Sequence, residues 1–176
     1  MIINNNFVID ELHFKDASSL NRLMVANADR FQSFFPKTLN QNLTLADSEA
    51  YIFRKQDEIQ SKTEFTYALR VEKKGAVAGL IILKALDWDK EQGELAYCID
   101  IKHEGRGWMT QTVNQVSNYA FADLRLRTLQ IIVHKTNIGS IRVAEKCGYA
   151  WQKTLLKAYT PPNKDPMNME LYERYR

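Results

Sequence analysis

Only two cysteines, four prolines and seven glycines occur among the 176 residues of the sequence. Cys98 and Cys147 are too few for a disulfide framework, and they lack the spacing of metal ligands. We predict that both are reduced thiols of the core, and we expect no metal site. No Gly/Ser-rich linker, low-complexity tract or internal repeat divides the chain. These absences predict a single domain over residues 1–176.

Long apolar runs and a charge of one sign are missing as well. No run approaches the ~20 apolar residues that cross a bilayer, and the first residues lack the basic and apolar regions of a secretion signal. Twenty-four Lys and Arg against 21 Asp and Glu leave a net charge of +3, spread along the chain. We therefore expect a cytoplasmic protein that binds neither a membrane nor nucleic acid directly. The 45% hydrophobic content is enough for a buried core.

The first part of the chain reads as a strand followed by helices. Phe7–Phe14 is the expected strand, and Asp16 is the expected N-cap of a helix with apolar residues at helical spacing. Phe35–Asn42 is expected to be a loop. The segment that begins at Thr44 resembles a capping box and predicts a helix towards Ile59.

The remaining chain predicts strands with two helices between them. An antiparallel hairpin is expected from Phe65–Val71 and Ala76–Leu83, joined at Lys73-Lys74-Gly75. Further elements are expected at Glu94–Ile101 (strand), Gly107 to about Leu124 (helix), Leu129–Val133 (strand), Ile141–Cys147 (helix before Gly148), and Ala150–Tyr159 and Met167–Tyr172 (strands flanking the turn Pro161–Pro166). This order favours an α/β (α+β) fold, with a mixed sheet and helices on both faces.

The segment Glu104-Gly105-Arg106-Gly107 connects a predicted strand to a predicted helix. Main-chain N–H groups at such a junction point out of the helix start and favour an anion. A plain glycine turn is the alternative. The segment has neither the Gly-Lys-Ser/Thr ending of a P-loop nor the third glycine of a dinucleotide fingerprint.

Two blocks of the sequence resemble the GNAT superfamily of N-acetyltransferases. Lys102-His103-Glu104-Gly105-Arg106-Gly107 is similar to the coenzyme A loop Gln/Arg-x-x-Gly-x-Gly/Ala, although lysine replaces the first residue. Asn137 to Tyr149 resembles the family's Asn-x-x-Ser-x-x-x-x-Glu-Lys-x-Gly-Phe/Tyr. Glu94-Leu95-Ala96-Tyr97 looks like the corresponding strand of the ribosomal-protein serine and alanine N-acetyltransferase branch.

The resemblance implies a mostly antiparallel central sheet in which a parallel pair, Glu94–Ile101 and Leu129–Val133, splays apart. It also implies that acetyl-CoA is the co-substrate and that an amine attacks the thioester directly. The residues that it implies for coenzyme binding are Cys98, Ile99, Lys102, His103, Glu104, Gly105, Arg106, Gly107, Trp108, Met109, Asn137 and Ser140.

Three side chains are candidates for the proton transfers. Ser140 is the candidate acid for the leaving thiolate; a serine that caps a helix is the alternative. Glu94 is the candidate base, the alternative being a solvated glutamate at a strand edge. His134 is a second candidate, and a purely structural histidine at a strand end is its alternative. Ala144 stands where many relatives carry a tyrosine acid. Asn137 is expected to bind pantetheine or position a water; its alternative role is a helix cap.

The acceptor amine is the least determined part of the interpretation. Phe31, Phe34, Phe35, Trp88, Trp151 and Tyr159 are candidates for an acceptor pocket, and a role in the core is the alternative. The favoured acceptor is an α-amino group, such as the N-terminus of a ribosomal protein. A polyamine or aminoglycoside acceptor, and a non-catalytic acyl-CoA-binding module, are the other hypotheses. A homodimer is left open.

Overall fold

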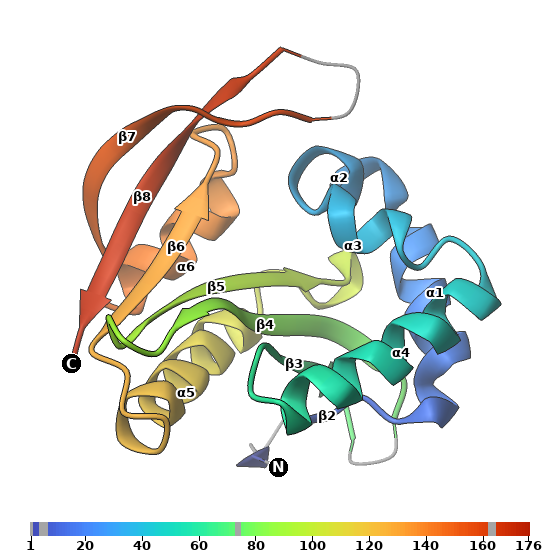
Figure 1. Cartoon of the computed structure of the whole chain (residues 1–176). Coiled ribbons are helices and arrows are strands. Elements are labelled where there is room, and N and C mark those ends of the chain that lie inside the picture. Colours follow the sequence, from blue (N-terminus) through green and yellow to red (C-terminus); the bar gives the residue numbers. More distant parts are fainter. Residues whose placement is uncertain (1, 4–6, 73–74, 162–164) are drawn as a thin grey trace. The chain divides into compact units, whose positions relative to one another are not determined.

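The structure of the chain is a computed structural model that describes residues 2–3, 7–72, 75–161 and 165–176. Its strands are ordered β1-β2-β3-β4-β5-β6-β8-β7 in one mixed sheet (Figure 1). The chain divides into a first unit, residues 1–84 and 97–108, and a second unit, residues 85–96 and 109–176. Strands β4 (Val77–Asp87) and β5 (Gln92–Ile99) contribute to both units.

The first unit contains three further strands and four helices. They are β1 (Ile2–Ile3), β2 (Val8–Glu11), α1 (Ala17–Ala26), α2 (Ala28–Phe34), α3 (Pro36–Asn40), α4 (Leu45–Gln60) and β3 (Phe65–Arg70). β3 and β4 pair antiparallel from Phe65↔Leu83 to Arg70↔Val77, which confirms the predicted hairpin. The expected turn residues Lys73 and Lys74 lie outside the described residues.

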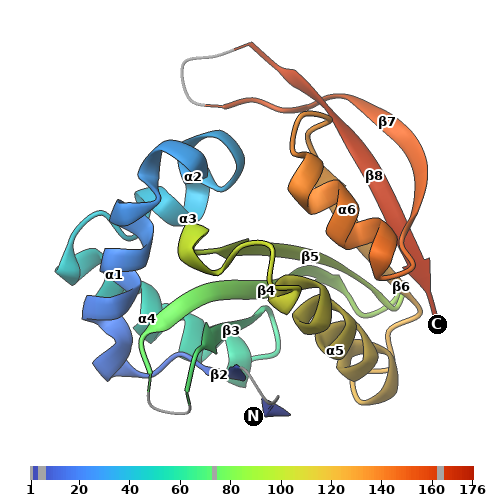
Figure 2. The same ribbon diagram turned by 180° about the vertical axis from the view of Figure 1, so that it is seen from behind.

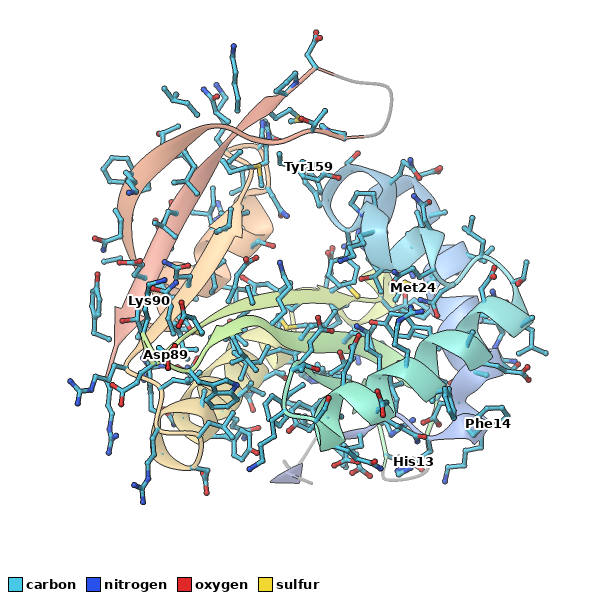
Figure 3. All side chains as sticks on the ribbon, in the orientation of Figure 1. His13, Phe14, Met24, Asp89, Lys90 and Tyr159 are labelled. Carbon is cyan, nitrogen blue, oxygen red and sulfur yellow. The ribbon has the colours of Figure 1, made fainter. Side chains whose placement is uncertain are left out.

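Side chains on opposite faces of the first unit's strands enter two separate clusters. Ala68 and Cys98 pack with the helical residues of the larger cluster, which includes Met24 of α1 (Figure 3). Their sequence neighbours Tyr67 and Ile99 pack in the smaller cluster, with Trp108 at the start of α5. This alternation is the period of two of a β-strand, and it confirms the prediction of helices on both faces.

The predicted loop Phe35–Asn42 is wrong, because most of it forms α3. Pro36 is the first helical residue, a position where its fixed φ is favourable and its missing N–H is not needed. The Leu39 main-chain N–H donates to the Phe35 carbonyl at 3.1 Å, and the side-chain Nδ2 of Asn42 donates to the Thr38 carbonyl at 2.9 Å. By contrast, the capping box predicted at Thr44 is confirmed at the start of α4.

Asp16 occupies the N-cap position of α1, yet its carboxylate does not cap the helix. Arg70 of β3 donates from Nη1 to Asp16 Oδ1 at 2.9 Å, and the His13 N–H donates to Oδ2 at 2.7 Å. Both members of the ion pair are buried. A buried guanidinium needs a carboxylate partner, and this pairing takes precedence over the expected capping bond. The strand before it is also shorter than predicted: β2 ends at Glu11, and residues Phe14–Asp16 form a 3-10 turn.

The second unit carries the parallel strand pair. β5 pairs parallel with β6 (Thr128–Val133) through Gln92↔Thr128, Gly93↔Leu129 and Glu94↔Gln130. β8 (Met167–Tyr175) lies antiparallel between β6 and the edge strand β7 (Ala150–Tyr159). One parallel pair in a mostly antiparallel sheet is therefore confirmed. Of the expected turn Pro161–Pro166, residues 162–164 lie outside the described residues.

The remaining helices are α5 (Trp108–Ala122) and α6 (Ile138–Lys146), and α6 lies against β6 (Figure 2). Gly148 follows α6 with a φ of +78°, as expected of a left-handed C′ residue. In the ranges that the structure describes, no helix has the length and apolar character needed to cross a membrane.

Candidate active site

The glycine segment lies between β5 and α5, as the sequence predicts. β5 ends at Ile99, a 3-10 turn spans Ile101–His103, and α5 begins at Trp108. Gly105 and Gly107 have φ angles of +72° and +75°, in the left-handed region that only glycine enters without strain. Gly105, Arg106 and Gly107 are all exposed. Main-chain N–H groups at a junction of this kind favour an anion.

Trp108 anchors the start of α5 in the first unit's smaller cluster. Its indole stacks on Phe7, with ring centroids 5.4 Å apart, and on His103, at 4.8 Å. The guanidinium of Arg106 lies 5.8 Å from the same ring. Trp108 and Met109 are buried. The side chains of both residues are therefore largely shielded from solvent.

Two residues of the first unit that the sequence interpretation missed hold the segment after β5. The buried Asn27, between α1 and α2, accepts at Oδ1 from the Ile101 N–H at 3.1 Å. Arg30 of α2 pairs with the carboxylate of Glu104 and donates to the Ile99 carbonyl at 3.5 Å. The Asn27–Ile101 hydrogen bond and the Arg30–Glu104 pair each join residues 74 positions apart, so no local pattern could have revealed them.

The two cysteines are buried free thiols, as predicted. Burial raises the pKa of Cys98 to about 12. Burial also raises the pKa of Cys147, whose Sγ donates to the Thr110 carbonyl at 3.2 Å. A nucleophilic cysteine needs a lowered pKa, so neither thiol is suited to accept an acetyl group.

In the second unit, Glu94 stands in register with Gln130 of β6, which in turn is in register with Glu173 of β8. The Gln130 amide donates to Glu173 Oε1 at 2.7 Å, and it accepts from the Gln92 amide at 3.2 Å. Glu94 is half-buried. The candidate base therefore lies beside a row of hydrogen-bonded polar side chains.

Asn137 and Ser140 lie together at the start of α6. Asn137 is the N-cap, and its Oδ1 accepts from the Ser140 N–H at 3.2 Å. The capping role considered for Asn137 is thus present in the structure. Ala144, at the position of the tyrosine of other relatives, is fully buried. Tyr149 follows the helix, but its hydroxyl is buried 2.7 Å from the Ser117 hydroxyl.

His134 follows β6, and its ring is engaged on one side. The Thr136 N–H donates to His134 Nδ1 at 3.3 Å, and Thr136 Oγ1 lies 2.8 Å from the same nitrogen. One ring nitrogen of His134 is therefore already in contact with Thr136.

The aromatic side chains proposed for an acceptor pocket divide into core and surface residues. Phe31 is buried in the larger cluster, and its ring lies 6.1 Å from that of Phe35. Trp88 and Trp151 are 44% and 55% exposed. Tyr159, at the end of β7, is half-buried (Figure 3). Phe31 thus has the core role that was its alternative.

Comparison with known proteins gives one matching family. The model of the acetyltransferase (GNAT) domain matches residues 6–150. YdaF, a candidate ribosomal N-acetyltransferase of Bacillus subtilis (strain 168), is 27% identical over 149 residues, which are 84% of this chain and 79% of YdaF. The spermidine N(1)-acetyltransferase of Escherichia coli (strain K12) is 26% identical over 133 residues, or 76% of this chain and 67% of that enzyme.

Solved structures show the same fold. RimL, a ribosomal-protein α-N-acetyltransferase in complex with coenzyme A, matches with a TM-score of 0.90 at 15% identity, over 99% of this chain and 96% of RimL. The family match covers well over half of the chain and includes the strand, glycine segment and helix described above. The chain belongs to the GNAT acetyltransferase family.

Proposed function

We propose that the protein transfers the acetyl group of acetyl-CoA to an amine, most favourably the α-amino group of a protein or peptide. The observation that carries the proposal is the glycine segment at the start of α5, with two left-handed glycines, in a chain of the GNAT family. Main-chain N–H groups at this junction would bind the coenzyme's pyrophosphate. Lys102 and Arg106, both exposed, add positive charge beside it.

The reaction is a direct attack of the amine on the thioester carbonyl. A C–N bond forms and the C–S bond breaks, giving an amide and the thiol of coenzyme A. One proton leaves the amine and one proton reaches the departing sulfur, so the enzyme needs a base and an acid but no nucleophile. The high pKa of the Cys98 thiol supports this route over an acetyl-cysteine intermediate.

Glu94 is the proposed base and Ser140 the proposed acid. Between the two candidate bases, Glu94 is favoured because it lies on β5, the strand that leads into the glycine segment, whereas Nδ1 of His134 is already engaged by Thr136. Main-chain groups at Cys98 and Ile99 are proposed to bind the pantetheine arm and polarise the thioester carbonyl. Asn137 is a further proposed contact for pantetheine through its side-chain amide, alongside its capping role.

Release of free coenzyme A thiol, followed with a chromogenic thiol reagent, tests the proposal. The acceptor panel should contain peptides with serine or alanine N-termini, spermidine and an aminoglycoside. We expect turnover with the peptides at the highest kcat/KM. Absence of turnover with every acceptor, together with tight acetyl-CoA binding by calorimetry, would instead support the non-catalytic acyl-CoA-binding module.

A polyamine acceptor is the second candidate. It is supported by the 26% identity to the spermidine N(1)-acetyltransferase. The net charge of +3 gives no long-range attraction for a polycation. A kcat/KM for spermidine that exceeds that of every peptide would replace the α-amino proposal with this one.

A further inference from the structure

We propose that Arg30 is a positioning residue for coenzyme binding, which holds the segment between β5 and the glycines and neutralises the carboxylate of Glu104. The inference rests on the proposed function, because it assumes that the coenzyme's pyrophosphate binds at this segment. Arg30 belongs to α2, which is distant in the sequence from both β5 and the glycine segment.

Arg30 reaches three groups of the first unit at once. Its Nη2 pairs with the Glu104 carboxylate, and its Nη1 donates to Asn27 Oδ1 at 3.0 Å and to the Ile99 carbonyl at 3.5 Å. Asn27 is itself fixed, because its amide nitrogen donates to the Leu23 carbonyl at 2.9 Å while Oδ1 also accepts from the Ile101 N–H. The guanidinium is thus held on a buried amide rather than on a mobile surface group.

The negative charge of Glu104 is unfavourable for an anion-binding site in this segment. Glu104 immediately precedes Gly105, so its carboxylate belongs to the same short segment as the main-chain N–H groups that would bind a pyrophosphate. A carboxylate and a pyrophosphate carry like charges and repel each other, so the charge of Glu104 opposes binding. Pairing with Arg30 cancels that charge. The two side chains are 34% and 48% exposed, so solvent moderates the effect without abolishing it.

The test is acetyl-CoA affinity by calorimetry for the full chain, comparing wild type with Arg30→Ala, Arg30→Lys, Glu104→Gln and the double variant Arg30→Ala/Glu104→Gln. We expect Arg30→Ala to weaken binding by roughly threefold to tenfold. Arg30→Lys should recover most of the loss, because it restores the charge. The double variant should also recover, because no uncompensated carboxylate is left beside the phosphate.

Two readouts separate this role from a merely structural one. The ratio of the dissociation constants of Arg30→Ala and wild type should fall towards one in ~1 M salt, where the Debye length is about 3 Å. In steady-state assays the KM for acetyl-CoA should rise while kcat changes little. Arg22→Ala, which removes an exposed positive charge of α1, is the matched control and should bind acetyl-CoA within about twofold of wild type.

The outcomes distinguish the inference from the function on which it rests. If the wild-type protein does not bind acetyl-CoA, both are wrong. If wild type binds and Arg30→Ala binds equally well, the inference alone is wrong. It is also wrong if the double variant stays as weak as Arg30→Ala, since the Glu104 charge would then not be the cause.

Discussion

A Cβ atom added to Gly79 would lie 2.6 Å from the carbonyl oxygen of Cys98. Side-chain carbons do not approach a main-chain oxygen so closely, so β4 can lie against the end of β5 only because residue 79 has no side chain. The Cys98–Ile99 main chain is also the stretch that we propose for the pantetheine arm. Packing of this strand pair and coenzyme binding therefore depend on the same glycine.

Gly79→Ala should lower the free energy of unfolding by about 1–3 kcal/mol and weaken acetyl-CoA binding, because the added methyl displaces the Cys98 carbonyl. Urea unfolding and calorimetry measure the two effects. Gly139→Ala is the control for stability, since the contact there is only at 4.0 Å. Its helical position should make it neutral or slightly stabilising. Unchanged stability of Gly79→Ala would contradict the close approach.

The left-handed glycines allow a matched pair of variants. Gly105 and Gly148 have φ angles of +72° and +78°, and neither has an atom within 4 Å of an added Cβ. Alanine at either site should therefore cost about 1–2 kcal/mol of stability from backbone strain alone. Only Gly105→Ala should also weaken acetyl-CoA binding, because Gly105 belongs to the proposed phosphate site. Equal coenzyme affinity of the two variants would argue against that site.

The proposed acid and base predict a loss of rate without a loss of coenzyme affinity. Ser140→Ala and Glu94→Gln should each lower kcat by roughly 10²-fold, the usual contribution of a general acid or base. Acetyl-CoA affinity should change little. Glu91→Gln is the control; this glutamate of the same unit pairs with the exposed Arg127, and its loss should leave kcat unchanged. Full activity of Ser140→Ala would remove it as the acid.

The buried ion pair of the first unit predicts a large effect on stability. Arg70→Met leaves the Asp16 carboxylate buried without its partner, and should lower the free energy of unfolding by about 3–5 kcal/mol. Denaturant unfolding of the variant measures this. The exposed pair of Lys90 with Asp87 offers the comparison, and Lys90→Ala should unfold at the wild-type midpoint. A midpoint shift of similar size in both variants would contradict the assignment.

The Cys98 thiol predicts a specific alkaline sensitivity. The thiol ionises near pH 9 in the unfolded chain, whereas burial raises its pKa to about 12 in the folded protein. The unfolded state therefore loses the proton first, and the stability that the thiol contributes falls as the pH rises from about 9 to about 12. Stability measured between pH 8 and about 11 should decline less steeply in Cys98→Ala than in wild type. Parallel curves would show that the thiol does not titrate in this way.

Elements with a strong local signal were predicted well. The capping box at Thr44, the alternation of Phe65–Arg70 and the helix after Gly107 depend on neighbouring residues, and all three are found in the structure. α3 was not predicted, although Pro36 is at the first helical position, where proline is favoured.

For the candidate site, too, features that depend on neighbouring residues were predicted, and features that depend on the pairing of distant strands were not. The position of Gly105 and Gly107 between a strand and a helix was predicted from the sequence, and the structure adds that both have positive φ angles. The row from Glu94 through Gln130 to Glu173 depends on the register of three strands, which a single strand's sequence does not specify.

By itself, the sequence determined the order of the elements after Thr44, the glycine segment between a strand and a helix, and the block from Asn137 to Tyr149 that resembles the family's pattern. These are patterns of nearby residues, and local backbone preference is enough to produce them. Only the tertiary structure decided that Asp16 pairs with Arg70 and that Arg30 reaches Glu104. Such contacts join distant segments, and their partners are selected by the packing of whole elements around a core.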